Sequence, residues 1–237
     1  MDKKGKTVLL YSGGTDSWLI RKIAKPDICL YFDIGTNTSK EEIKRLDKDV
    51  IIDTTLKGLG QLERSDGSFI LPLRNLYFIV RAAEYGDNII LGTNKTDCHN
   101  DKTQEFADKV QDLLNYYYGP SKDGLCEIRD MKVDFSYKKY DKPDLVKMYL
   151  ENGGTIEEYL NETFSCYTPL QDGSECCNCK PCFNKMMALY INVGANKLPK
   201  GYLHKFVNIL QDKVDNGHRY FKKDLLEKAL EDAKKDI

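Results

Sequence analysis

The chain has 237 residues, of which 41% are hydrophobic and 31% charged, a balance typical of a globular protein with a real core. Its longest uninterrupted apolar run is Met186–Ile191, far shorter than the roughly 20 residues of a membrane helix, and its first residues lack the apolar stretch of a secretory signal. A net charge of −1 provides no overall attraction to nucleic acid or to an anionic membrane. We therefore expect a cytoplasmic protein and exclude membrane proteins, disordered tails and small secreted proteins.

Short apolar runs alternate with helical patterns through the first half of the chain. Strands are predicted at residues 7–11, 28–32, 50–53 and 88–91, and helices at 16–24, 39–46, 75–85 and 103–118. Strands and helices that alternate in this way form βαβ units. We predict an α/β fold with a doubly wound parallel sheet, and we expect the tyrosines 116–118 at the end of a helix to pack rather than to stack on a base.

After Asp134 the pattern changes to helices and cysteines. Helices are predicted at residues 143–151, 156–161, 202–216 and 224–235, with a cysteine-rich stretch at 166–182. A chain without a secretory signal is expected to keep its eight cysteines reduced.

The segment Ser12-Gly13-Gly14-Thr15-Asp16-Ser17 lies between the first predicted strand and helix. Adjacent glycines allow a sharp turn with exposed N–H groups, and the following helix presents its positive end, so the loop suits a phosphate chain. It lacks the GxxxxGK[ST] pattern of a Walker A loop, and Asp16 beside an anion predicts a bridging Mg²⁺. The alternative is an ordinary glycine turn capped by Asp16 or Ser17. The whole string resembles the pyrophosphate loop (PP-loop) of the ATP pyrophosphatases, which split ATP between its α- and β-phosphates.

Four cysteines have the spacing of a metal site. Cys176, Cys179 and Cys182 form a CxxCxxC run, and Cys166 adds a fourth thiolate. Four thiolates match tetrahedral Zn²⁺ in a closed structural site. An iron–sulfur cluster and a redox CxxC pair are the alternatives.

Together these motifs resemble the 7-cyano-7-deazaguanine synthases of queuosine biosynthesis, over roughly residues 7–190. Beside the loop and the cysteines, the shared motifs are Arg74-Asn75, the loop Asn94-Lys-Thr-Asp97, Asp101-Lys-Thr-Gln-Glu105-Phe106 and Ser165-Cys166-Tyr167. The resemblance implies an adenine nucleotide alpha hydrolase-like fold with a C-terminal helical zinc-binding segment. It divides the chain into an ATP-binding α/β domain at residues 1–165 and a zinc-binding segment with closing helices at 166–237, packed as part of the same domain.

The resemblance also implies a ligase reaction. ATP with Mg²⁺ lies in the Ser12–Ser17 loop, an acid is adenylated and ammonia forms an amide, which a second ATP converts to the nitrile. Asp16, Arg74 and Asp97 are the candidate catalytic residues, and Asn94, Asp97 and Asp101 are the candidates for substrate binding. Each of these roles has an alternative. Arg74 could instead pair with a surface acid, and Asp97 and Asp101 could be solvated loop residues without a role in binding. Relatives suggest a homodimer, and no membrane or direct nucleic-acid partner is expected.

Several positions depart from the family pattern. The family's D-Y-G-Q-R-H becomes Asp33-Ile-Gly-Thr-Asn-Thr38, its D-C-R-P-E-F becomes DKTQEF, and Lys185 replaces the arginine that usually follows the last cysteine. These departures leave open a relative that stops at the amide or joins the activated acid to a protein amine. A sulfur-inserting tRNA-modifying enzyme is a further alternative, disfavoured by the neutral charge. A catalytically inactive zinc-stapled binding module is the alternative from another class.

Overall fold

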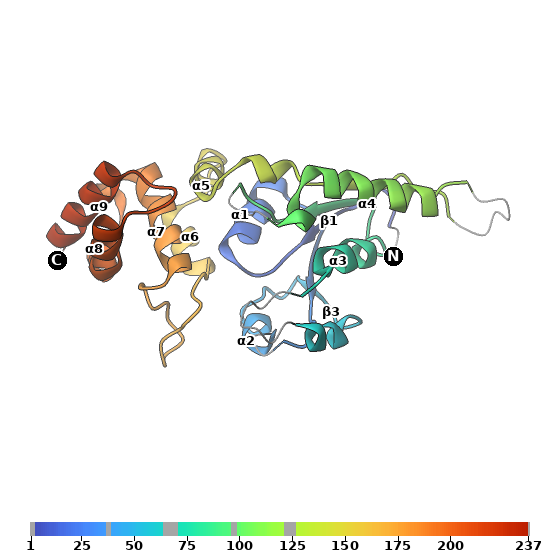
Figure 1. Ribbon diagram of the computed structural model, residues 1–237, viewed down its shortest axis with the longest axis horizontal. Helices are drawn as coiled ribbons and strands as arrows, with labels where there is room; N and C mark the ends of the chain where they lie inside the picture. Colours follow the sequence, from blue (N-terminus) through green and yellow to red (C-terminus); the bar gives the residue numbers. More distant parts are fainter. Residues whose placement is uncertain (1–2, 37–38, 64–70, 96–98, 121–126, 237) are drawn as a thin grey trace. The chain divides into compact units, whose positions relative to one another are not determined.

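The computed structural model describes residues 3–36, 39–63, 71–95, 99–120 and 127–236 (Figure 1). The chain forms two compact units, Met1–Asp141 and Lys142–Ile237. The boundary predicted between residues 165 and 166 stays a prediction. No helix in the described part of the chain has both the length and the apolar character needed to cross a bilayer.

The first unit is built on a parallel sheet. Its strands are β1 (Thr7–Leu10), β2 (Ile28–Phe32), β3 (Ile51–Asp53), β4 (Asn88–Leu91) and β5 (Lys132–Asp134), in the order β3-β2-β1-β4-β5. Central β1 pairs Leu9 with Cys29 on one side and with Ile90 on the other. The four predicted strands are confirmed, and β5 is an addition at the edge of the sheet.

Helices cover both faces of this sheet. The α-helices are α1 (Thr15–Ala24), α2 (Ser39–Ile43), α3 (Arg74–Ala82) and α4 (Gln104–Tyr117), and the 3₁₀ turns are η1 (Lys57–Leu62), η2 (Asn100–Lys102) and η3 (Ser136–Lys139). The strand order reverses after β3, so right-handed crossovers place α1 and α2 on one face and α3 and α4 on the other. This is the predicted doubly wound α/β fold.

The alternation of side chains along β1 shows the two faces directly. Val8 and Leu10 belong to a buried cluster with Ile79 of α3 and Val110 of α4. Leu9, between them, is fully buried and points to the opposite face. Burial on both faces explains why the strands are continuous apolar runs rather than alternating ones.

The second unit is helical. It contains α5 (Lys142–Glu151), α6 (Ile156–Glu162), α7 (Lys180–Val193), η4 (Ala195–Lys197), η5 (Leu203–Phe206), α8 (Val207–Asn216) and α9 (Lys223–Lys235). Figure 1 shows α7, α8 and α9 grouped in orange to red, and their facing side chains form one core with the cysteine segment. Helix α7 is anchored there by Phe183, Met186 and Met187, all fully buried.

Four local expectations were wrong in whole or in part. Helix α3 ends at Ala82 instead of reaching residue 85. Helix α2 ends at Ile43 instead of reaching residue 46. The helix expected over 202–216 is divided into η5 and α8, with Phe206 between helical turns of different pitch. Of the three tyrosines at the end of α4, Tyr118 packs against the core of the first unit as expected, whereas Tyr116 and Tyr117 are 88% and 62% exposed.

Candidate active site and metal centre

The Ser12–Ser17 loop forms the turn from β1 into α1. Gly13 has φ +73°, a left-handed conformation that side chains disfavour, and a Cβ there would lie 3.1 Å from Leu46 Cδ2. Gly14 precedes α1 with extended angles, and its carbonyl accepts the hydrogen bond of Trp18 N at 3.0 Å. The glycine pair therefore turns the chain directly into the positive end of α1, as the sequence predicts.

Two serine hydroxyls hold this turn in shape. Ser12 Oγ and Ser17 Oγ are hydrogen-bonded at 3.0 Å, and Ser17 Oγ also donates to Gly14 O at 2.9 Å. The backbone N–H of Gly14 donates to Ser12 Oγ at 3.3 Å. Ser12 is exposed whereas Ser17 is buried. One hydroxyl thus fixes the loop from inside, and the other lies where an anion from solvent would meet it.

Asp16 and Asn94 meet across the point where the strand order reverses. Asn94, in the loop after β4, donates from Nδ2 to Asp16 Oδ2 at 3.0 Å. The Asn94 loop is itself held by Lys138 Nζ, which donates to the Asn94 carbonyl at 3.2 Å, and by a backbone bond from Lys95 N to Tyr140 O. Because β1 and β4 are neighbours whose crossovers go to opposite faces, their carboxyl ends form the crevice where open α/β sheets bind ligands.

Asn75 and Asp101 form a second contact. Asn75, 4% exposed in the first turn of α3, donates from Nδ2 to Asp101 Oδ2 at 2.9 Å and to the Asp101 carbonyl at 3.3 Å. Arg74 precedes it and is half-buried. Thr103 then begins α4, with its hydroxyl accepting Phe106 N at 3.2 Å. The Arg74-Asn75 and Asp101 motifs are therefore neighbours in space, whereas Asp97 lies outside the described residues.

Sequence reasoning gave no role to two carboxylates at the ends of β2 and β3. Asp33, 6% exposed, accepts Gly35 N at 3.0 Å and pairs with Lys57 Nζ at 3.2 Å. Burial alone would raise the pKa of Asp33, but these partners lower it below its usual value. Asp53 accepts hydrogen bonds from Arg81 and Tyr85. The sequence signal that could have pointed to both residues is their position at or directly after the end of an apolar strand.

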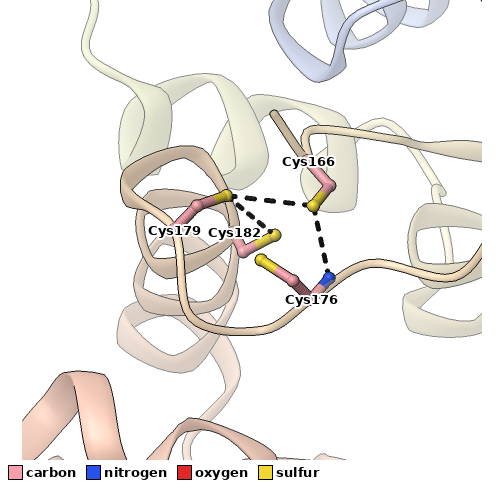
Figure 2. A group of neighbouring side chains, drawn as sticks. All are labelled: Cys166, Cys176, Cys179 and Cys182. Carbon is pink, nitrogen blue, oxygen red and sulfur yellow. Dashed lines mark hydrogen bonds between the residues drawn. The ribbon is translucent and has the colours of Figure 1, made fainter. Parts of the chain in front are cut away.

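The four motif cysteines converge in the second unit (Figure 2). Cys179 is the N-cap of α7 and Cys182 lies in its first turn, whereas Cys166 and Cys176 come from the preceding segment. Their four sulfurs lie within 4.8 Å of one another, and those of Cys179 and Cys182 are 3.4 Å apart. All four are free thiols, since a disulfide would need about 2.05 Å.

This geometry fits a tetrahedral metal ion. Zn–S bonds of about 2.3 Å place the sulfurs of a tetrahedral site about 3.8 Å apart, and the Cys179–Cys166 and Cys179–Cys182 separations are 4.0 and 3.4 Å. Cys177, with φ +53°, turns the chain between two of the ligands. The cluster could therefore hold a metal with little movement of the chain.

Backbone and hydroxyl donors surround the sulfurs. Cys176 N donates to Cys166 Sγ at 3.2 Å, and Asn178 N and Thr168 Oγ1 each donate to Cys176 Sγ at 3.4 Å. Burial raises the pKa of Cys176, but the Thr168 and Asn178 bonds outweigh it and lower that pKa to about 6. Burial raises the pKa of Cys182. The site thus favours one thiolate by its own hydrogen bonds and leaves the buried thiol to be deprotonated by a metal.

A buried ion pair joins the two segments that carry these cysteines. Lys185, 2% exposed in α7, donates from Nζ to Glu175 Oε2 at 2.9 Å and to the Thr163 carbonyl at 2.7 Å. Glu175 Oε1 in turn accepts Ser165 N at 2.6 Å. Glu175 precedes Cys176 and Ser165 precedes Cys166, so Lys185 holds both ligand segments against α7. The sequence showed Lys185 only as a departure from a family arginine.

Comparison with known proteins gives a consistent match. The family model of the queuosine biosynthesis protein QueC matches residues 27–193. Two curated relatives, each called 7-cyano-7-deazaguanine synthase, come from Rickettsia akari (strain Hartford) and Rickettsia prowazekii (strain Madrid E). Each is 24% identical over 79% of this chain and 95% of its own length. No solved structure matches the chain. The family match contains the four cysteines and ends before η4.

Proposed function

The chain belongs to the family of the queuosine biosynthesis protein QueC, and from this membership we propose that it converts 7-carboxy-7-deazaguanine and ammonia to 7-cyano-7-deazaguanine with ATP. In this proposal the protein is a ligase that forms C–N bonds and releases AMP and pyrophosphate. The names of the two relatives support the reaction. The observation that carries its ATP-dependent part is the Ser12–Ser17 loop beside the Asp16–Asn94 contact, at the reversal point of the sheet.

The reaction balances in four steps. The carboxylate attacks the α-phosphorus of ATP, which releases pyrophosphate and leaves an acyl adenylate. Ammonia attacks the acyl carbon, and the amide forms as AMP and a proton leave. The amide oxygen attacks a second ATP and again releases pyrophosphate. The nitrogen gives up one of its two protons to leave a neutral adenylated imidate, and loss of AMP together with the second proton then leaves the nitrile. No step needs a covalent bond to the protein, so positioning and charge neutralisation carry the chemistry.

The loop residues have distinct roles in this scheme. In the proposal, the N–H groups at Gly13, Gly14 and Thr15 and the Ser12 hydroxyl bind the leaving pyrophosphate. Gly14 N and Ser12 Oγ then exchange their hydrogen bonds within the loop for bonds to phosphate oxygens, while the bond from Ser17 Oγ to Gly14 O keeps the loop rigid. Asp16 would hold Mg²⁺, which supplies positive charge to the phosphates when bound. In the proposal Asn94 binds substrate as predicted, and its hydrogen bond to Asp16 also orients that carboxylate.

Three other residues keep their predicted roles in the proposal. Arg74 contacts phosphate from the start of α3. Asp101 accepts N–H groups of the deazaguanine ring, because a carboxylate has about four acceptor positions and Asn75 occupies one of them. Asp97 does the same from the preceding loop. The cysteines Cys166, Cys176, Cys179 and Cys182 hold structural Zn²⁺, since four protein ligands leave no open position for chemistry.

A relative that stops at the amide, or that joins the activated acid to a protein amine, is the second candidate. The observation that favours it is the environment of Asp33. Its carboxylate is bonded to Gly35 and Lys57, in the segment where the family's usual Q-R-H is missing. The altered segment after β2 could change which acceptor reacts with the activated acid. The Ser12–Ser17 loop, which would activate the acid with ATP, is retained.

Incubation of the protein with Mg-ATP, ammonium and 7-carboxy-7-deazaguanine, followed by mass spectrometry, tests the proposal. AMP together with the nitrile is the expected result. AMP with the amide alone supports the second candidate, and absence of AMP refutes this substrate. Asp16→Asn should lower AMP formation roughly 100-fold or more, as loss of a charge-stabilising group does. Asp130→Asn, at an exposed position, is the matched control and should leave the rate unchanged.

A further inference from the structure

A groove of about 640 Å³ opens in the second unit, outside the predicted nucleotide loop. One wall comes from Lys180 at the start of α7, and the other from Asp212 and Lys213 of α8. The turn after α8 closes it with His218, Arg219 and Tyr220. Helix α8 and this turn lie beyond the residues that the family model matches, so the groove is built in part by the chain's own C-terminal extension.

Positive charge is in excess along this groove. Three cationic side chains line it with one carboxylate, and Asp212 is paired with Lys213 at 2.6 Å. Residues 194–237 carry ten Lys and Arg against seven Asp and Glu, whereas the whole chain carries 36 against 37. The extension is therefore basic in a chain that is nearly neutral, which favours an anionic ligand.

His218 lies where this positive charge converges. Its ring stacks on Phe221 with centroids 5.0 Å apart and planes 14° from parallel, and it contacts Phe183 at 5.1 Å. Burial lowers the pKa of His218, and the charges of Lys213 and Lys180 lower it further. The aromatic neighbours hold the His218 ring in place, and the nearby lysines disfavour its protonated form. An anion bound in the groove would offset these positive charges and stabilise the imidazolium.

The same turn offers an aromatic surface. Tyr220 is 44% exposed, its ring lies edge-on to His218 at 5.8 Å, and the Arg219 guanidinium lies 5.4 Å from its centroid. A planar ligand can stack on such a ring while its phosphate reaches the neighbouring cations. A groove of this volume also lies within the usual range of small-molecule sites.

We propose that this groove binds a nucleoside phosphate, with the phosphate between Lys180, Lys213 and Arg219 and the base against Tyr220. The groove shares no residue with the Ser12–Ser17 loop. Nucleotide binding in the groove can therefore be tested separately from the synthase reaction, and failure of one proposal would not refute the other.

Histidine NMR tests the proposal at the groove itself. The chain has three histidines, so the spectrum of His218→Gln assigns the His218 ring signals. AMP at about 1 mM should shift these signals and raise the pKa of His218, because an added anion favours the imidazolium. The shift should also be seen in Asp16→Asn, in which the loop of the other unit is altered and the groove is unchanged. If AMP changes neither the signals nor the pKa of His218, the proposal is wrong.

Variants and simpler ligands separate the two parts of the site. Arg219→Gln and Lys213→Gln should each weaken AMP binding about tenfold, as expected for loss of one charge-assisted hydrogen bond. Lys228→Gln, an exposed charge change on α9 outside the groove, should not. Equal affinities for pyrophosphate and AMP would overturn the role of the base. Equal affinities for adenosine and AMP would overturn the role of the cations.

Discussion

Replacing Lys185 by methionine should destabilise the helical unit and weaken binding of the Zn²⁺ proposed at its four cysteines. Lys185 is 2% exposed, and its ammonium contacts Glu175 and the Thr163 carbonyl. Methionine fills a similar volume but makes neither contact. The substitution leaves the Glu175 carboxylate, 19% exposed, without its cation. It also removes the hydrogen bond that the Thr163 carbonyl accepts from Lys185 Nζ.

The magnitude follows from the burial of the pair. Removing one partner of a buried ion pair costs about 3–5 kcal/mol, because the other charge is left uncompensated. Since Glu175 retains some contact with water, we expect a loss near the lower end, about 3 kcal/mol. Removing both charges in Lys185→Met/Glu175→Gln should cost less than the sum of the two single changes. Zinc affinity should fall about 10- to 100-fold, as expected when groups that orient the ligands are lost.

Urea unfolding of the zinc-loaded protein and competition with a colorimetric chelator measure these two effects. The fluorescence of Trp18, the single tryptophan, reports on unfolding of the first unit, whereas zinc release to the chelator reports on the second unit. Lys223→Met is the control, because its pair with Glu227 at 3.8 Å is exposed and should contribute less than about 1 kcal/mol. If Lys185→Met keeps wild-type zinc affinity and stability, or if the double variant is additive, Lys185 does not position the ligand segments.

Three further predictions concern other parts of the chain. Gly13→Ala should cost about 1–3 kcal/mol in urea unfolding, because φ +73° and the 3.1 Å approach to Leu46 disfavour a Cβ; an unchanged midpoint would contradict this. Burial raises the pKa of Asp53, but hydrogen bonds from Thr55, Tyr85 and Arg81 outweigh it and lower that pKa. Its stabilising contribution should therefore be complete above about pH 4 and lost as the pH falls below that value. The stability gap between wild type and Asp53→Asn should shrink over that range in acid titrations, and a constant gap would refute the assignment. Cys177→Ser should retain one zinc equivalent by atomic absorption whereas Cys176→Ser should lose affinity, and the reverse result would exchange their roles.

Local sequence was sufficient for the elements whose signals are local. The strands of the first unit are apolar runs because both faces of the sheet are buried. Thr103 begins α4 through its own hydroxyl, and Gly13 makes the turn after β1 by its own φ angle. The spacing Cys176–Cys179–Cys182 likewise brings three thiols together within one turn and the start of a helix. Each of these features depends on neighbours within a few residues, so pattern and chemistry reveal it.

Tertiary structure decided the features that depend on distant partners. Strand β5 has three residues and a single buried side chain, Val133, so only its pairing with β4 identifies it. Helix α7 is buried around most of its circumference, so it lacks the polar face from which a helical period is recognised. The Asp16–Asn94 contact joins residues 78 positions apart, and Glu175 meets Lys185 only because the cysteine segment folds back on α7. Sequence therefore determined which residues could do chemistry, and the packing of the sheet and helices decided which of them act together.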